Sequence, residues 1–256
     1  MIIKLFMASF IIFSQHLYSS PIFKSTIFKH DSIYSDTSKF INHGASIAVK
    51  DSIYYCSWFT GEQEGNVDCR IALSKSYDFG LTWEQPEIIF SGNDSIQWRD
   101  PLLFMWNDTL RMIFVKIYGH GSGSQADSTD IFYSSLSNSL NNWTDPQRID
   151  TGKNRPAPPH HNPIFVDGEL MFGFYWRNNG SNQTHAGILV ASQNLKDWEV
   201  RGDIYSPGEK LIEPSLIETE TNNLKLYFRT SLGRIYSSLS INNGNNWSIP
   251  EQIPIY

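Results

Sequence analysis

The sequence predicts an all-β fold, a β-propeller made of repeated four-stranded blades. Three observations predict it. A turn motif recurs at intervals of about 50 residues, a second polar motif runs in step with it, and no segment keeps a helical period. Within the 256 residues, complete units span about 42–90, 99–150, 161–204 and 211–254.

The turn motif is clearest at residues 76–83, Ser-Tyr-Asp-Phe-Gly-Leu-Thr-Trp. An Asp near the start of a tight turn can accept hydrogen bonds from backbone amides two residues on, and Gly supplies the positive φ. The Trp then buries its ring beneath the turn. Residues 240–247 repeat the frame with amides in the acidic and Thr places, and shorter forms lie at 137–143 and 192–198. The residues predicted to build the two full turns are Ser76, Asp78, Gly80, Thr82, Trp83, Ser240, Asn242, Gly244 and Trp247.

The second motif opens each unit with a polar residue, often followed by Pro, and then a short apolar run. Its four copies lie at 42–47, 99–104, 161–165 and 213–217. In a propeller the innermost strand of each blade lines the central channel, so the polar residues before these strands should converge. They are His43, Asp100, Asn162 and Glu213, with Arg99 and His161 beside two of them. The alternative is that Asp, Asn and Glu before Pro only begin turns.

Residues 22–28 look like the outer strand of a further blade, whose remaining strands should come from the C-terminal end of the sequence. Either four blades close a small ring or, as we favour, the chain is an incomplete copy of a larger propeller. Residues 1–20 combine a lone cation, a short apolar stretch and small residues, which is typical of a secretory signal peptide. The alternative for this stretch is a buried strand. We therefore expect a secreted or lumenal propeller domain over residues 21–256.

Asn-x-Ser/Thr sequons recur along the chain, as in secreted glycoproteins. They begin at Asn93, Asn107, Asn142, Asn179, Asn182 and Asn246. The formal net charge is −6 and there is no basic cluster, so nucleic acids and anionic membranes are not expected partners. No later segment is apolar enough to cross a membrane.

The two cysteines, Cys56 and Cys69, are expected on adjacent strands of the first blade. They could form a cross-strand disulfide in an oxidising compartment, or serve as two small buried apolar residues. His160 and His161 have no cysteines or spaced carboxylates near them in sequence, so neither a metal site nor a cofactor is predicted.

Two features could carry chemistry. Glu213 and Arg229 are expected at the start and end of one hairpin, which would bring a carboxylate and a guanidinium together at the channel, where an Arg can bind an anionic substrate. The acidic, glycine-flanked loop 61–68 offers Glu64 and Asp68 as a general acid, which glycoside hydrolysis usually needs. The alternatives are a structural ion pair and a solvated acidic turn.

The turn motif and several longer segments resemble the sialidase superfamily of BNR/Asp-box repeat proteins, especially its short secreted sialidase-like branch. The segments that carry the resemblance are 42–46, 58–68, 98–104, 162–168, 213–217 and 227–236. The resemblance implies a six-bladed propeller in which three arginines hold the carboxylate of a sugar. It also implies a tyrosine nucleophile paired with a glutamate, and a loop aspartate as acid/base.

Transferred to this sequence, the resemblance makes Glu213 the glutamate and Arg229 the second arginine, with Glu64 or Asp68 near the acid. The predicted catalytic residues are Glu213, Glu64, Asp68 and Asp100, and the predicted substrate-binding residues are Arg229, Arg99, His43, Asn162 and Arg234. The sequence departs from the family in three ways. Asn42-His43 stands where the first arginine is expected, the third arginine and the nucleophile would lie beyond residue 256, and neither Tyr227 nor Tyr236 is at the matching place.

The resemblance predicts a sialidase-like glycoside hydrolase domain acting on terminal sialic acid or a related acidic sugar of a glycoconjugate. One alternative is a non-catalytic propeller that binds glycans. A further alternative is a five-bladed fructosidase- or arabinosidase-like hydrolase, which the segments 98–101 and 213–214 also resemble.

Overall fold

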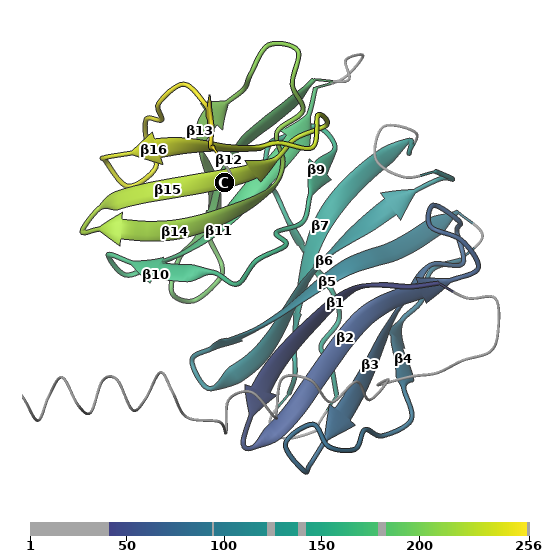
Figure 1. Cartoon of the computed structure of the whole chain (residues 1–256). Coiled ribbons are helices and arrows are strands. Elements are labelled where there is room, and N and C mark those ends of the chain that lie inside the picture. The colour runs from purple at the N-terminus through teal and green to yellow at the C-terminus, as the bar shows by residue number, and fades with distance from the viewer. Residues whose placement is uncertain (1–40, 94, 122–125, 138–141, 179–182, 255–256) are drawn as a thin grey trace, which may run out of the picture. The chain divides into compact units, whose positions relative to one another are not determined.

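The computed structural model describes residues 41–93, 95–121, 126–137, 142–178 and 183–254 (Figure 1). All of them belong to one compact unit, residues 36–256. The predicted signal peptide, the early strand 22–28 and the sequons at Asn179 and Asn182 lie outside the described residues. In the described ranges every regular element is a β-strand, and no helix there could cross a membrane.

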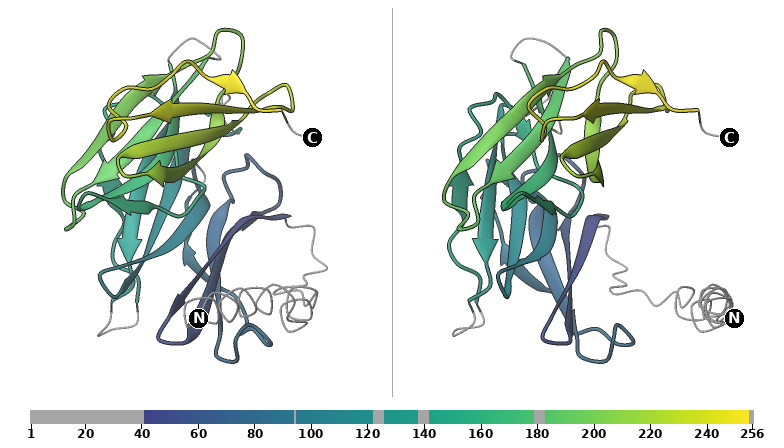
Figure 2. Two further views of the ribbon diagram at one scale, coloured as in Figure 1. Left: turned by 60° about the vertical axis from the view of Figure 1, so that its left-hand side comes forward. Right: turned by 90° about the vertical axis from the view of Figure 1, so that its left-hand side faces the viewer.

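The strands form four antiparallel sheets, which are the four blades of the predicted propeller (Figures 1 and 2). Blade 1 contains β1 (Ile41–Lys50), β2 (Ile53–Gly61), β3 (Arg70–Ser76) and β4 (Glu87–Phe90). Blade 2 contains β5 (Ile96–Trp106), β6 (Thr109–Tyr118), β7 (Ser128–Ser135) and β8 (Gln147–Ile149). Blade 3 contains β9 (Pro156–Ala157), β10 (Ile164–Val166), β11 (Glu169–Arg177), β12 (Thr184–Ala191) and β13 (Trp198–Ile204). Blade 4 contains β14 (Ile212–Glu220), β15 (Asn223–Arg229), β16 (Ile235–Ser240) and β17 (Glu251–Gln252).

The strands pair in chain order within each blade. The short strand β9 pairs with the C-terminal part of β11, and β10 pairs with its N-terminal part. The four units deduced from the sequence are therefore confirmed as an all-β, four-blade propeller arrangement.

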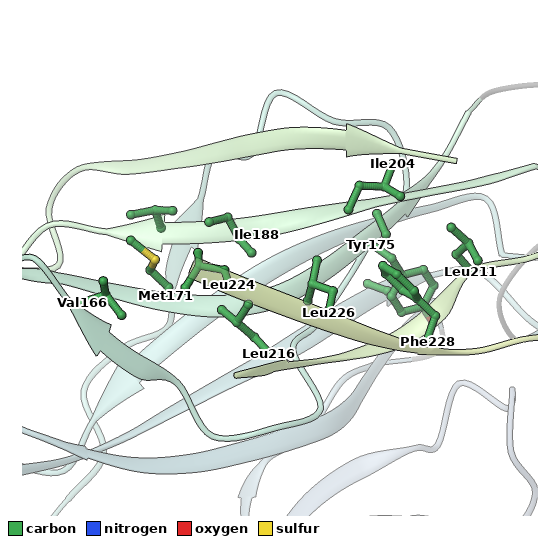
Figure 3. Packing of buried hydrophobic residues seen from close by; sticks show 13 residues of the cluster. Val166, Met171, Tyr175, Ile188, Ile204, Leu211, Leu216, Leu224, Leu226 and Phe228 are labelled. Carbon is green, nitrogen blue, oxygen red and sulfur yellow. The ribbon is translucent and has the colours of Figure 1, made fainter. Parts of the chain in front are cut away.

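A hydrophobic cluster lies between each pair of successive blades, because side chains alternate between the two faces of a strand. On β6, Met112 and Phe114 belong to the cluster shared with blade 1, whereas Ile113 belongs to the cluster shared with blade 3. On β11, Phe172 and Phe174 face blade 2, and Met171 and Tyr175 face blade 4. Figure 3 shows this last cluster, in which Tyr175 lies beside Phe228 and Leu211.

Burying a side chain of this size stabilises the fold by about 1.5–3 kcal/mol. The middle strands of the blades have nearly continuous apolar sequences, because neighbouring blades cover both of their faces.

The two full turn motifs have the same hydrogen bonds. The Gly80 amide donates to Ser76 Oγ at 2.8 Å and the Thr82 amide donates to Asp78 Oδ1 at 2.8 Å. In blade 4 the corresponding distances are 2.9 Å for Gly244 to Ser240 and 2.9 Å for Asn246 to Asn242. Trp83 and Trp247 each donate an indole N–H to the glycine carbonyl, at 3.2 Å and 2.8 Å. An amide can therefore replace the carboxylate, because the turn needs an acceptor oxygen in that place and not a charge.

The predicted disulfide between Cys56 and Cys69 is wrong, because both thiols are free. The β2–β3 register pairs Cys56 with Ser74 and Thr60 with Arg70, so Cys69 lies beside the end of β2, five residues past Cys56. At ~3.3 Å per residue the two are about 16 Å apart, far beyond the ~7 Å that a disulfide tolerates. Burial raises the pKa of Cys69 and that of Cys56, the latter to about 11, as expected for two small buried residues.

Candidate active-site pocket

The innermost strands of blades 1, 2 and 4 each carry a β-bulge at the same place. The pairing register shifts between His43 and Ser46 on β1, between Arg99 and Leu102 on β5, and between Ile212 and Ser215 on β14. A bulge bends its strand and re-aims a side chain, and bulges are frequent beside active sites.

The first residue of each bulge has a left-handed backbone: Gly44 at φ +65°, Asp100 at +51° and Glu213 at +51°. Glycine tolerates this conformation, whereas a residue with a side chain is strained there by roughly 1–3 kcal/mol. Such strain is concentrated at functional sites. The carboxylates at two of three equivalent bulges are thus the first structural indication of a site.

The register also corrects one alignment made from the sequence. The motif groups His43 with Asp100 and Glu213, but Gly44 is the residue that occupies their place, and His43 corresponds to Arg99. Blade 1 has Gly-Ala where the other blades have a polar residue followed by Pro, so the Pro that marks the frame elsewhere is missing.

A pocket of about 260 Å³ opens where the bulges of blades 1 and 2 meet blade 3. Its walls are residues 44–47 of β1, 100–102 of β5 and 159–162 of the segment between β9 and β10. Asp100 and Asn162, predicted to converge, therefore line one cavity. Gly44 lets blade 1 approach closely, because a Cβ there would lie 3.4 Å from Asp100 Oδ1 and 3.3 Å from the Phe59 ring.

Glu213 and Arg229 meet as the hairpin of β14 and β15 predicts. Arg229 Nη1 lies 2.6 Å from Glu213 Oε1, and the two side chains are 61% and 35% exposed. Glu213 is also near His161 of the pocket wall, because its charge acts on the imidazole. Burial and the neighbouring His160 nevertheless hold the pKa of His161 below its usual range, so this imidazole is neutral at neutral pH. The ion pair thus lies beside the pocket.

Tyr175 is a site residue that the sequence motifs do not reveal. It lies on β11, only 8% exposed, and the charges of Arg177, Asp100, Glu213 and Arg229 all act on it. His160 stacks on its ring at 6.3 Å, and the Arg177 guanidinium lies 5.8 Å from the ring centre. Burial raises the pKa of Tyr175 to about 12. Its hydroxyl is therefore protonated at neutral pH and suited to donate a hydrogen bond.

A weak signal for this tyrosine exists in the sequence. Tyr175 and Arg177 alternate with the core residues Phe174 and Trp176, so they face the other side of the strand. The sequence around Tyr175 does not show that this side of the strand lies near two carboxylates, Asp100 and Glu213, from other blades.

Glu64 is the carboxylate of the acidic loop that pairs with Arg99, the residue next to Asp100 of the pocket wall. Its Oε1 lies 2.6 Å from Arg99 Nη2 and its Oε2 lies 3.7 Å from His43 Nδ1. The Arg99 side chain is only 6% exposed and its Cζ lies 4.7 Å from the centre of the Phe59 ring. Within the described residues, Arg99 Nε and Nη1 have no hydrogen-bond partner. Arg99 is thus a buried cation whose counter-charge is Glu64.

Asp68 and Arg234 lie elsewhere. Asp68 Oδ2 accepts a hydrogen bond from the Glu62 amide at 2.7 Å, so this carboxylate closes the loop that carries Glu64. Arg234 Nη1 donates to Gln252 Oε1 at 3.0 Å, on the outermost strand of blade 4. Asp68 therefore has a role within the loop, and neither Asp68 nor Arg234 is among the residues that line the pocket.

Over the described part of the chain, no group of three His, Cys, Asp or Glu side chains is arranged to hold a metal ion. The pocket wall holds one carboxylate, that of Asp100, and the neutral imidazole of His161. The Glu213–Arg229 and Glu64–Arg99 pairs and the protonated phenol of Tyr175 lie around this wall. Carboxylates can act as acid and base on a glycosidic bond.

Comparison with known proteins agrees with this fold. Residues 53–255 match the family model of the BNR repeat-like domain. The Hadza microbial sialidase Hz136 is 17% identical with a TM-score of 0.67, over 81% of this chain and 46% of its own. The NanB sialidase from Streptococcus pneumoniae is 11% identical with a TM-score of 0.68, over 87% of this chain and 54% of its own. No curated protein matches the sequence significantly.

A third solved structure is Zg3597, a family 117 glycoside hydrolase from Zobellia galactanivorans. It is 14% identical with a TM-score of 0.59, over 82% of this chain and 69% of its own. At these identities the likeness shows the fold alone. The chain spans about half the length of the two sialidases.

Proposed function

The chain belongs to the BNR repeat-like domain family, and from this premise we propose that its pocket hydrolyses the glycosidic bond of a terminal acidic sugar, sialic acid or a related one, on a glycoconjugate. The observation that carries the proposal is the pair of strained bulges at Asp100 and Glu213, whose charges both act on Tyr175, with Arg229 2.6 Å from Glu213. The solved structures with this fold include sialidases and a family 117 glycoside hydrolase, which supports a carbohydrate substrate.

In this proposal Arg229 binds the carboxylate of the sugar. Its side chain is 61% exposed, and a guanidinium can pair bidentately with a carboxylate. Glu213, already 2.6 Å from Arg229, orients the guanidinium while the substrate binds.

The carboxylates divide the chemistry. Glu64, on the loop above Arg99, protonates the leaving glycosidic oxygen as its bond to the anomeric carbon breaks, and Asp100 in the pocket wall stabilises the positive charge that develops on the sugar ring. Water then forms the new bond to the anomeric carbon and gives up a proton to the Glu64 carboxylate, which regenerates the acid. Tyr175, which feels the charges of Asp100 and Glu213, donates a hydrogen bond from its hydroxyl to one of these carboxylates. Arg99 fixes Glu64 and is a positioning residue.

The test is release of a fluorophore from an aryl sialoside by wild type, Glu213→Gln and Asp100→Asn. Both variants are expected to lose at least about 100-fold in kcat/KM, because Asp100→Asn removes a charge that stabilises the transition state and Glu213→Gln releases the guanidinium that positions the substrate. Glu251→Gln, an exposed carboxylate on β17, is the matched control and should keep wild-type turnover. Turnover that is equal in the wild type and both site variants would contradict the proposal.

A second candidate, a non-catalytic glycan-binding site, is favoured by one observation. Arg99 and Arg229 are both already paired with carboxylates, so neither offers an unpaired positive charge to an anionic sugar. Folded protein that binds sialylated or neutral glycans on an array but releases no aryl sialoside or aryl furanoside would establish this candidate instead.

A further inference from the structure

A second pocket, of about 340 Å³, lies where blade 3 meets the turn of blade 4. Residues 203–205 at the end of β13 form one wall, and residues 245–250, from the last part of the turn to the start of β17, form the other. It shares no lining residue with the pocket described above. Its chemistry is therefore independent of the proposed hydrolase site.

Tyr205 supplies an aromatic surface to this pocket. It is 51% exposed, although an aromatic ring is normally buried because of its large apolar area. Its ring stacks on His185 with centroids 5.5 Å apart and an interplanar angle of 22°. His185 in turn stacks on Trp176 at 5.8 Å and 25°, and Trp176 is only 3% exposed. The exposed ring is thus held by a stack that continues into the core.

The same imidazole also positions a carboxylate. His185 Nδ1 lies 2.5 Å from Asp203 Oδ1, and His185 Nε2 lies 2.9 Å from Asn178 Nδ2. The His185 side chain is 15% exposed, whereas that of Asp203 is 60% exposed. One largely buried ring therefore fixes both the Tyr205 plane and the Asp203 carboxylate. Sites built to bind a ligand have their contact groups held in this way by a supporting residue.

The other wall is polar. Asn245 and Asn246 are exposed on the wall opposite Asp203, so side-chain amides border the aromatic surface. No cationic side chain is among the residues that line this pocket. A flat apolar ring can contact the apolar face of a pyranose, and polar groups at its edge can form hydrogen bonds with the hydroxyls of the sugar. The unpaired side of a carboxylate excludes an acidic sugar by charge repulsion.

From this arrangement we propose that the pocket between Asp203, Tyr205 and Asn245 is a second, non-catalytic binding site for a neutral hexose ring of a glycan. The Tyr205 ring stacks on the apolar face of the sugar, and Asp203 accepts hydrogen bonds from its hydroxyls. This site would bind a neutral sugar, whereas the proposed hydrolase pocket binds an acidic one.

The experiment is saturation-transfer NMR with the methyl glycosides of galactose, glucose, mannose and N-acetylglucosamine. The protein is the full chain from a host without N-glycosylation, because Asn246 lies in a sequon at the rim. At least one neutral hexoside should bind wild type, and Tyr205→Ala should weaken it about tenfold or more, which corresponds to ~1.4 kcal/mol. Tyr205→Phe should retain binding, and Asp203→Asn should weaken it.

Two control variants test whether the hexoside binds in this pocket and nowhere else on the protein. Tyr77→Ala removes another exposed tyrosine, 59% exposed and outside the pocket, and should bind as wild type does. Glu213→Gln should also bind the neutral hexoside as wild type does, whatever its hydrolytic activity. The proposal is overturned if no neutral hexoside binds, if Tyr205→Ala binds as tightly as wild type, or if Glu213→Gln loses the binding.

Discussion

Arg99 with Glu64, and Arg229 with Glu213, form two ion pairs of the same length in opposite surroundings. Each has a nitrogen–oxygen distance of 2.6 Å. The Arg99 side chain is 6% exposed beneath an acidic loop, whereas that of Arg229 is 61% exposed beside the pocket. Contact distance therefore does not separate an arginine that only holds its carboxylate in place from one that can exchange its partner for a substrate. The burial of the arginine separates the two cases, because a guanidinium that loses its partner is hydrated if it is exposed and stays without water if it is buried.

The energetic consequence differs accordingly. An exposed pair contributes about 0–1 kcal/mol, since water replaces either partner. Removing one partner of a buried pair costs about 3–5 kcal/mol, because the remaining charge stays out of water. Substitutions at the two pairs test this contrast directly.

The largest effect is on turnover at the exposed pair. Glu213→Gln should reduce kcat/KM on an aryl sialoside by about 100-fold or more, because the Arg229 guanidinium loses the carboxylate that orients it toward the substrate. The free energy of unfolding should change by less than about 1 kcal/mol, because Arg229 remains solvated. Urea denaturation of the same samples measures this. A stability loss of several kcal/mol would make the pair structural and break the comparison.

The next effect is on stability at the buried pair. Glu64→Gln leaves the Arg99 cation buried without its counter-charge, so unfolding free energy should fall by about 2–3 kcal/mol. The expected loss lies below the full range because Glu64 itself is 43% exposed. Chemical denaturation measures it, with Glu62→Gln on the same loop as the control, since the carboxylate that pairs with Arg99 is that of Glu64. Equal stability of the two variants would contradict the role of Glu64 as counter-charge.

A smaller effect is expected at the wall between blades 1 and 2. Gly44→Ala adds a Cβ near Asp100 and Phe59 at a φ of +65°, and should cost about 1 kcal/mol or more. Gly152→Ala is the control, because Gly152 has a φ of +60° but nothing within 4 Å of an added Cβ. The difference in unfolding free energy between the variants isolates the crowding from the backbone strain. Equal losses would mean that the approach of the two blades is not tight.

The smallest effect concerns a carboxylate outside both pairs. The hydroxyl and amide of Thr82, then other turn donors, lower the pKa of Asp78 from 3.8 to about 2. The folded pKa is depressed, so the stabilisation is present above the unfolded value and is lost as pH falls from about 4 to 2. Asp78→Asn should remove this part of the acid dependence, measured as denaturation midpoints at pH 2–5. Asn242→Ala in blade 4 should leave the acid dependence of stability unchanged, because the acceptor in that turn is the neutral amide oxygen of Asn242.

Part of the site could be predicted from the sequence because its signals are local. The Glu213–Arg229 contact follows from one hairpin, whose two ends must lie side by side. The convergence of Asp100 and Asn162 follows from two copies of one motif. Tyr175 could not be found in this way, because it becomes a site residue only when strands from three blades surround it.

By itself, the sequence determined the blades and their turns, because a turn such as 76–83 contains all of its own donors, acceptors and its tryptophan. Only the tertiary structure decided the bulge register that puts Gly44 opposite Asp100, and the offset that separates Cys56 from Cys69. It also decided the burial of Arg99, which commits this arginine to Glu64, whereas the exposed Arg229 can still contact a substrate. These outcomes depend on contacts between strands that are distant in the chain, and such contacts leave no periodic signal within either strand.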